Sequence, residues 1–276
     1  MSLQSFVKLS DGNSIPALGL GVWKASNEQL IPAIDTALEA GYRLFDTAAI
    51  YGNEEGVGNA LHNSALSRSE LFVTTKIWND RHDDAEQALS ESLKKLKLDY
   101  VDLYLIHWPA PKQDKFVNAW HQLISLKEQG LIRSIGVSNF NPHHIERLHK
   151  ETGVYPVINQ IELNPLMQQK DIIKWNSDHN IHTESWSPLS RGVDGIIHND
   201  IISAIAEKYN KTVAQVVIRW HLDLGLIAIP KSVTPSRIIE NFNVFDFKLD
   251  EDEISKIGSL DINQRLGRDP ENFENI

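Results

Sequence analysis

The sequence predicts one α/β domain over residues 1–276, built as a (β/α)8 (TIM) barrel. Eight short β-rich runs recur along the chain, and the stretches between most of them carry apolar residues at helical spacing. The runs lie at 18–22, 42–46, 71–76, 101–107, 132–138, 157–162, 181–186 and 226–230. An open, doubly wound parallel sheet is the alternative fold, but such sheets commonly have fewer strands.

The spacing of the runs fits repeated strand–helix units. Consecutive runs end 24 to 31 residues apart, except the last, which ends 44 residues after the seventh. The stretch 27–41 is typical of a helix that stops at Gly41. The long final interval has room for a loop at about 188–199 and for helices at 200–210 and 212–225.

The first apolar segment, "FVKLSDGNSIPAL", predicts a β-hairpin ahead of the first barrel strand. Its apolar residues alternate with polar ones on both sides of Asp11, Gly12 and Asn13, which are typical turn residues. We expect this hairpin to close the N-terminal end of the barrel.

The composition excludes several classes of function. The formal net charge is −10, and nucleic acids and anionic membranes select basic surfaces, so we expect neither as a partner. The chain has no cysteine, which excludes disulfides, thiolate catalysis and cysteine-ligated metals, and we expect no metal site. No leader-like segment or long apolar run is present. We expect a cytoplasmic monomer that acts on a small molecule.

Polar and aromatic side chains gather where the predicted strands end. In a (β/α)8 barrel these ends meet at one mouth, where ligands bind. The residues concerned are Trp23, Asp46 with Tyr51, Lys76 with Trp78, His107 with Trp108, Ser138 with Asn139, Gln160, Trp186, and Lys231 with Ser232. Each alone has an ordinary explanation as a turn, packing or solvated residue. Their coincidence at neighbouring strand ends indicates a site.

An acid, a phenol, an amine and an imidazole at three neighbouring strand ends suit proton transfer to a carbonyl oxygen. A phenol titrates at about 10, so Tyr51 needs an ammonium such as Lys76 to lower its pKa. Asp46 would keep Lys76 charged, and His107 would donate a hydrogen bond to the carbonyl oxygen. A Schiff-base aldolase with Lys76 as nucleophile is an alternative, although that chemistry needs a neutral lysine.

Seven segments of the chain resemble the aldo-keto reductases, in the family's order. They are "FDTAAIYGNE", the lysine of "TTKIW", "LIHWP", "SIGVSNF", "NQIELNP", "SWSPLSRG" and "IPKSVTPSRIIEN". Within the family the chain is most similar to the short bacterial members that act on 2,5-diketo-D-gluconate. The resemblance implies a (β/α)8 barrel, NADPH as hydride donor, and Asp46, Tyr51, Lys76 and His107 as catalytic residues, with Tyr51 as the acid.

NADPH is expected at the loops after the last two strands, where such barrels bind phosphate. A Rossmann fingerprint is not expected, because "GVGNAL" at 56–61 has Leu61 in place of the third glycine. Lys231 and Arg237 would suit the 2′-phosphate. The resemblance implies that the cofactor contacts are Val22, Trp23, Asp46, Ser138, Asn139, Gln160, Trp186, Ser187, Leu189, Lys231, Ser232, Val233, Thr234, Arg237, Glu240 and Asn241.

The substrate pocket is expected to have aromatic walls, which offer apolar area and N–H donors. Its predicted residues are Trp23, Ile50, Tyr51, Trp78, His107 and Trp108. The tail after residue 260 is short and polar, which favours an open pocket, and Arg265 or Arg268 would meet a substrate carboxylate. We expect NADPH-dependent reduction of small carbonyls such as methylglyoxal. A non-catalytic NADPH sensor is the remaining alternative.

Overall fold

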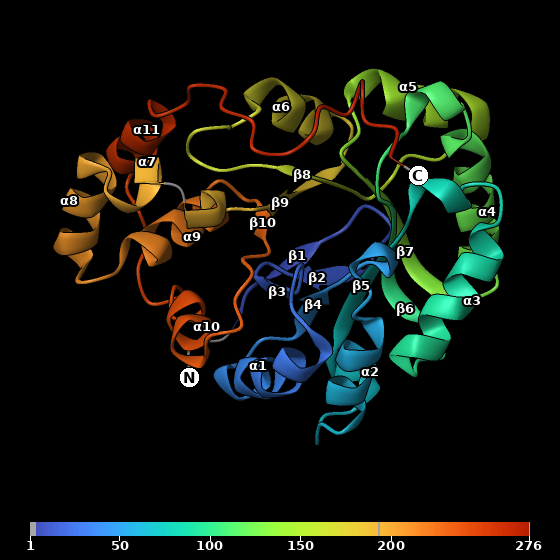
Figure 1. Cartoon of the computed structure of the whole chain (residues 1–276). Coiled ribbons are helices and arrows are strands. Elements are labelled where there is room, and N and C mark those ends of the chain that lie inside the picture. The colour runs from blue at the N-terminus through green and yellow to red at the C-terminus, as the bar shows by residue number, and fades with distance from the viewer. Residues whose placement is uncertain (1–3, 193, 276) are drawn as a thin grey trace.

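Eight parallel strands form a barrel in the computed structural model, which describes residues 4–192 and 194–275 (Figure 1). The strands are β3 (Gly19–Gly21), β4 (Leu44–Asp46), β5 (Phe72–Ile77), β6 (Val101–Ile106), β7 (Ile132–Ser138), β8 (Ile158–Glu162), β9 (His182–Trp186) and β10 (Ile227–Ala228). Each strand pairs with the next in the chain, and parallel bridges from Leu18 to Ala228 and from Gly21 to Lys231 join the first to the last. All eight predicted strands are confirmed, and an open sheet is excluded.

Helices alternate with the strands and surround the barrel (Figure 1). They are α1 (Asn27–Ala40), α2 (Glu54–His62), α3 (Ala85–Leu96), α4 (Phe116–Glu128), α5 (Pro142–Thr152), α6 (Lys170–Asp178), α7 (Asp194–Ile197), α8 (Asp200–Tyr209), α9 (Val213–Asp223), α10 (Pro235–Phe242) and α11 (Glu251–Gly258). The long last interval holds both expected helices, as α8 and α9, and α1 ends at Gly41 with a φ of 114°, a conformation that favours glycine. No helix in the described part of the chain is long and apolar enough to cross a membrane.

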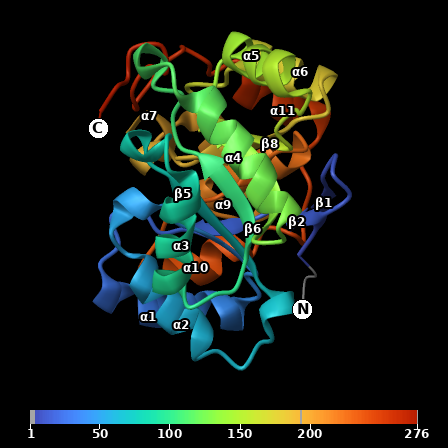
Figure 2. The ribbon, with the colours of Figure 1, turned by 90° about the vertical axis from the view of Figure 1, so that its right-hand side faces the viewer.

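The predicted N-terminal hairpin closes the amino end of the barrel. Its strands are β1 (Phe6–Lys8) and β2 (Ser14–Pro16). Ile15 is fully buried against the apolar side chains that fill this end. In the turn, the Asn13 side chain donates to the carbonyl of Arg133 at 3.1 Å, next to the start of β7. The hairpin and the C-terminal tail lie toward opposite ends of the barrel (Figure 2).

Side chains inside the barrel change from apolar to polar toward the mouth. Along β4, Leu44 belongs to the inner apolar cluster, Phe45 packs outward against the helices, and Asp46 is the next residue on the inside. Lys76 of β5 and Gln160 of β8 both donate hydrogen bonds to Asp46. A buried polar layer therefore sits above the apolar core, and its burial is tolerable because its members pair with one another.

The "GVGNAL" segment packs helices together and does not form a phosphate loop. It lies inside α2, which agrees with the expectation that it is not a Rossmann fingerprint. A Cβ on Gly58 would stand 2.6 Å from the carbonyl carbon of Leu96 at the end of α3, and one on Gly56 would stand 2.5 Å from Asn27 Oδ1. The missing side chains let α2 approach α1 and α3 closely.

Candidate active site

The loop after β4 brings Tyr51 to the mouth of the barrel. The strand ends at Asp46, and a short 3-10 turn over Ala49–Tyr51 follows. Asn53 fixes this loop, because its Oδ1 accepts from the Thr47 hydroxyl at 2.9 Å and its Nδ2 donates to the carbonyl of Val22 at 2.9 Å. The five-residue spacing of Asp46 and Tyr51 is thus one strand end followed by one turn.

Lys76 lies at the centre of the predicted catalytic group and is wholly buried. Its Nζ donates to Asp46 Oδ1 at 2.7 Å and to the carbonyl of Thr47 at 2.8 Å. The same nitrogen is 5.2 Å from the centre of the Tyr51 ring. The ring of His107, which follows β6, has its centre 5.7 Å from that of Tyr51. The structure therefore brings together all four residues that strand-end positions predicted.

Burial and the ion pair set the charges of these groups. Burial is the largest single influence on Lys76 and would lower its pKa, but the charge and hydrogen bond of Asp46, together with the charges of Tyr51 and Glu184, outweigh it and the pKa is raised. Burial, helped by Lys76, holds the pKa of His107 well below its usual range, so the imidazole is neutral. Burial raises the pKa of Tyr51, and the attraction of Lys76 reduces this shift without reversing it. The predicted influence of Lys76 is present, but the net shift of Tyr51 is upward.

The surroundings of His107 fix the position of its hydrogen. Nδ1 is buried and has no hydrogen-bond partner among the residues described. An N–H at this nitrogen would remain unsatisfied, which costs more than an unused lone pair on a weak acceptor. The neutral ring therefore carries its hydrogen on Nε2. Because His107 lines the cavity, this leaves a hydrogen-bond donor for a carbonyl oxygen.

A cavity of about 700 Å³ opens at the mouth of the barrel beside these residues. It is lined by all six predicted substrate residues: Trp23, Ile50, Tyr51, Trp78, His107 and Trp108. The indole of Trp78 meets the imidazole of His107 edge to face, with ring centres 5.1 Å apart. Apolar walls with a few convergent polar groups are typical of small-molecule sites.

The residues predicted to bind the cofactor fall into two groups. Those that line the cavity are Trp23, Asp46, Asn139, Gln160, Trp186, Ser187 and Lys231. Those outside its lining are Val22, Ser138 and Leu189, at or just after the ends of β3, β7 and β9, and Ser232, Val233, Thr234, Arg237, Glu240 and Asn241, on the turn after β10 and on α10. Lys231 belongs to the first group and directly precedes Ser232, so it connects the cavity lining with the second group along the chain.

Among the predicted carboxamide partners, Gln160 keeps a free acceptor. Asn139 is already engaged, because its Nδ2 donates to the carbonyl of His107 at 3.0 Å and its Oδ1 accepts from Trp186 Nε1 at 2.8 Å. Gln160 donates from Nε2 to Asp46 Oδ2 at 2.8 Å and to Oε2 of Glu184, on β9, at 3.0 Å. Both amide hydrogens are used, while Oε1 accepts no hydrogen bond from the described residues.

The C-terminal tail forms one wall of the cavity, a position that its sequence does not predict. Its lining residues are Leu266, Gly267, Arg268, Phe273 and Asn275. The Phe273 ring packs 4.5 Å from the ring of Trp108. We expected the tail only to leave the pocket open, whereas it supplies part of the pocket wall. Of the two tail arginines considered, Arg268 reaches the cavity and Arg265 instead bonds to Gln169.

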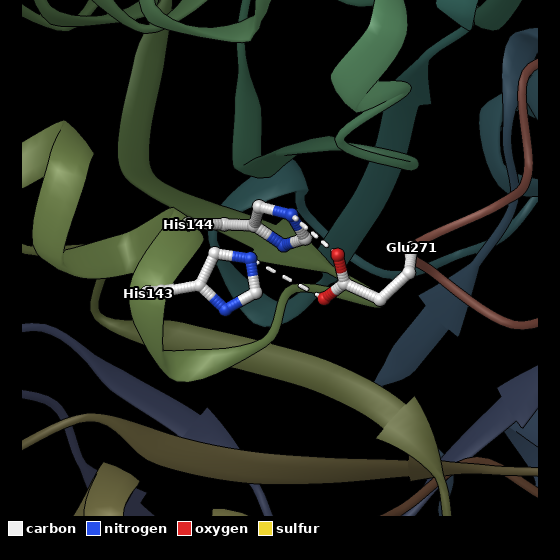
Figure 3. A group of neighbouring side chains, drawn as sticks. All are labelled: His143, His144 and Glu271. Carbon is white, nitrogen blue, oxygen red and sulfur yellow. Dashed lines mark ion pairs between the residues drawn. The ribbon is translucent and has the colours of Figure 1, made fainter.

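Two contacts hold this tail in place. Glu162, wholly buried at the end of β8, accepts from the backbone nitrogens of Leu266 at 2.7 Å and of Gly267 at 2.8 Å. Farther along, Glu271 lies against His143 and His144 at the start of α5, with nitrogen–oxygen distances of 3.3 and 3.8 Å (Figure 3).

The group of His143, His144 and Glu271 is compact enough to raise the question of a metal ion, since its ligand atoms lie within 4.8 Å of one another. However, His144 Nδ1 accepts a hydrogen bond from the backbone nitrogen of Asn141 at 3.2 Å. A neutral His144 therefore carries its hydrogen on Nε2, the atom that faces Glu271, and a protonated nitrogen cannot ligate a metal. We assign this group to tail attachment.

Cationic side chains surround the cavity although the chain as a whole is acidic. Lys24, Arg191, Lys231 and Arg268 line it, and among the described residues Asp46 is the one acid in its lining. Lys24 and Arg191 lie over the Trp23 ring, 4.4 and 4.9 Å from its centre. Neither residue was predicted, although Lys24 directly follows a predicted one. The arrangement favours anionic ligands despite the net charge of −10.

A closed barrel whose mouth combines a charged lysine, a phenol and a neutral imidazole defines an enzyme of the (β/α)8 class. The chain belongs to the aldo/keto reductase family, whose model matches residues 17–194 and 197–262. It is 60% identical over 273 residues to methylglyoxal reductase DkgA of Escherichia coli strain K12, covering 99% of both chains. It is 49% identical over 269 residues, 97% of each chain, to an aldo-keto reductase of Mycolicibacterium smegmatis.

Solved structures agree with this assignment. An aldo/keto reductase from Brucella melitensis superimposes with a TM-score of 0.91 at 50% identity, covering 95% of this chain and 99% of that one. A mutant of Gox0644 in complex with NADPH gives a TM-score of 0.93 at 45% identity, covering 98% of each chain. The predicted family and barrel fold are both confirmed.

Proposed function

We propose that this protein reduces small aldehydes and ketones, such as methylglyoxal or 2,5-diketo-D-gluconate, to alcohols with NADPH. The observation that carries the proposal is the buried Lys76–Asp46 pair next to Tyr51, with the neutral ring of His107 beside it. Protonation of a carbonyl oxygen needs such an acid and such a donor at one place. The name of the DkgA relatives supports methylglyoxal as substrate, and the NADPH complex of Gox0644 supports the cofactor.

Tyr51 is the proposed acid. Its raised pKa keeps the phenol protonated at neutral pH, so its oxygen always carries the proton to be given. Lys76 stabilises the phenolate that remains, and Asp46 keeps Lys76 charged. His107 donates from Nε2 to the carbonyl oxygen and holds it beside the phenol. The charge that develops on this oxygen makes it more basic than the phenolate, so the proton moves to it.

NADPH, when bound, supplies hydride to the carbonyl carbon. The residues fit such a group, because the cavity offers a free amide acceptor, an indole surface and several cations. We propose Lys231, Ser232, Thr234 and Arg237 for the 2′-phosphate, Glu240 and Asn241 for the adenine, Ser187 to Leu189 for the pyrophosphate, Trp186 for the nicotinamide ring, and Ser138, Asn139 and Gln160 for its carboxamide. Lys24 and Arg191 add positive charge for the phosphates.

Lys76 is poorly suited to the alternative Schiff-base mechanism. A nucleophilic lysine must be neutral and must reach its substrate. Lys76 is fully buried, its pKa is raised, and its nitrogen donates to two oxygen atoms. No observation therefore favours an aldolase.

The proposal is tested by Tyr51→Phe, which removes only the phenolic oxygen. We expect kcat for methylglyoxal reduction, followed by loss of NADPH absorbance, to fall by about 10²–10⁴-fold, the usual contribution of a general acid. NADPH affinity, measured by quenching of tryptophan fluorescence, should change by less than about threefold because the ring remains.

Tyr155→Phe is the matched control, because this tyrosine lies outside the cavity, stacked on His149. It should keep the wild-type rate. A fully active Tyr51→Phe protein would exclude Tyr51 as the acid. A wild-type protein that binds NADPH but turns over no member of a panel of aldehydes, keto-sugars and keto-acids would favour the sensor alternative.

A further inference from the structure

Glu184 is a buried acid in the barrel interior that the proposed mechanism leaves unused. It lies in the middle of β9, two residues before Trp186, and its side chain is wholly buried. In the sheet it stands between Gln160 of β8 and Ile227 of β10. An unused carboxyl group at this depth is costly unless its surroundings compensate for its burial.

The carboxyl group of Glu184 is connected to the proposed catalytic pair through one side chain. Gln160 donates from Nε2 to Asp46 Oδ2 at 2.8 Å and to Glu184 Oε2 at 3.0 Å. Asp46 in turn accepts from Lys76. Four residues on four strands therefore form one hydrogen-bonded chain, in which Glu184 and Asp46 together fix the orientation of the Gln160 amide.

The two carboxyl groups of this chain differ in their partners. Asp46 has Lys76 as a direct counter-charge, whereas Glu184 has no ion pair among the residues described, and its Oε1 has no hydrogen-bond partner there. A single amide cannot stabilise two buried carboxylates beside one ammonium. Glu184 is the member of the pair for which the neutral acid form costs less.

The groups that face Glu184 support the same assignment. Burial and the charge of Asp46 raise the pKa of Glu184 to about 8, against the smaller opposing effects of Gln160 and Lys76. From β10 the neighbour is the apolar Ile227, and Tyr51 feels the charge of Glu184 in turn. At neutral pH Glu184 therefore carries a proton.

We propose that Glu184 is a positioning residue of the reductase site: its neutral acid form holds the Gln160 amide in line with Asp46, and its ionisation weakens proton donation by Tyr51. The inference rests on the proposed function. The first part follows from the shared amide of Gln160, a cavity-lining residue whose Oε1 accepts no hydrogen bond from the described residues. The second follows from charge, because an added carboxylate beside Asp46 makes the phenolate of Tyr51 harder to form.

Two variants separate these roles. Glu184→Gln keeps an oxygen that accepts from Gln160 but cannot ionise, whereas Glu184→Leu removes the acceptor. Infrared spectra of the wild-type protein should contain the carbonyl stretch of a buried carboxylic acid that disappears as the pH rises through about 8 and is absent from Glu184→Gln. This measurement does not depend on turnover.

The kinetic readout is the pH profile of kcat/KM for methylglyoxal. The wild-type profile should fall as the pH rises through about 8, and this fall should move to higher pH in Glu184→Gln. Glu54→Gln, which replaces a buried glutamate on α2 outside the cavity lining, is the control and should keep the wild-type profile. Glu184→Leu should bind NADPH about tenfold more weakly by fluorescence titration, since Gln160 loses one of its two anchors.

Three results would overturn the inference: no such infrared band at neutral pH, identical pH profiles for the wild-type and Glu184→Gln proteins, or unchanged NADPH affinity in Glu184→Leu. Failure of the proposed function would look different. In that case the wild-type protein would show no carbonyl reduction at any pH, while the infrared band and the affinities would still report on Glu184.

Discussion

At the scale of single residues, the proposed chemistry uses charges that are costly to bury, and the Lys76–Asp46 pair is the clearest example. Its two side chains are 0% and 3% exposed, and the charged atoms are 2.7 Å apart. Breaking a buried pair costs far more than the pair contributes, because it leaves one charge buried alone. The stability of the fold therefore depends on keeping both partners, and the pair is also the proposed source of the charge that acts on Tyr51.

Asp46→Asn should lower the free energy of unfolding by about 3–5 kcal/mol, the usual cost of leaving a buried charge unpaired. Urea denaturation at neutral pH measures this loss. Asp178→Asn is the control, because its pair with Lys174 joins side chains that are 55% and 75% exposed and should contribute less than about 1 kcal/mol. Equal urea midpoints for the two variants would contradict the importance assigned to the buried pair.

At the scale of elements, the C-terminal tail completes a cavity that the barrel loops leave unfinished. Phe273 stands against Trp108 and, more distantly, Trp78, whose ring centre is 6.1 Å away. These rings lie at the rim, whereas Tyr51 lies in the short turn after β4 and Lys76 lies within β5. The tail should therefore influence substrate binding more than the chemical step.

Phe273→Ala should raise KM for methylglyoxal roughly tenfold, equivalent to about 1.4 kcal/mol, and change kcat much less. Steady-state kinetics with saturating NADPH separates the two parameters. Phe6→Ala removes a phenylalanine that is 61% exposed on the hairpin at the other end of the barrel, and should leave both parameters unchanged. A fall in kcat at constant KM would show that the tail acts on the chemistry.

At the scale of the whole molecule, the pKa of Glu184 makes stability depend on pH. Its pKa rises from 4.5 to about 8 on folding, so this group stabilises the folded state fully below about 4.5, and the contribution is lost as pH rises to about 8. Glu184→Gln does not titrate. As the pH rises from about 4.5 to about 8, the free energy of unfolding of this variant should increase progressively relative to that of the wild-type protein. Above about pH 8 the difference should stay constant, as measured by urea denaturation across the range. A difference independent of pH would contradict the shift.

How much of this structure can be predicted from the sequence depends on how far apart in the chain the interacting residues lie. The strands and Gly41 were predictable because apolar runs and helix stops are local signals, and the four proposed catalytic residues were predictable because strand ends share one mouth. Glu184 was missed because its inward direction depends on the register of β9, which residues far along the chain determine. Phe273 was missed because a polar tail gives no local sign of where it packs.

Glu162 limits which C-terminal tails can be exchanged between relatives of this protein. Its carboxylate is wholly buried, and its two oxygens accept from consecutive backbone nitrogens of the tail. A truncated or transplanted tail without that backbone turn would leave an acid in the barrel wall with nothing to bind. Engineering new specificity by swapping tails therefore requires the acceptor and the tail to be inherited together, as one transferable unit.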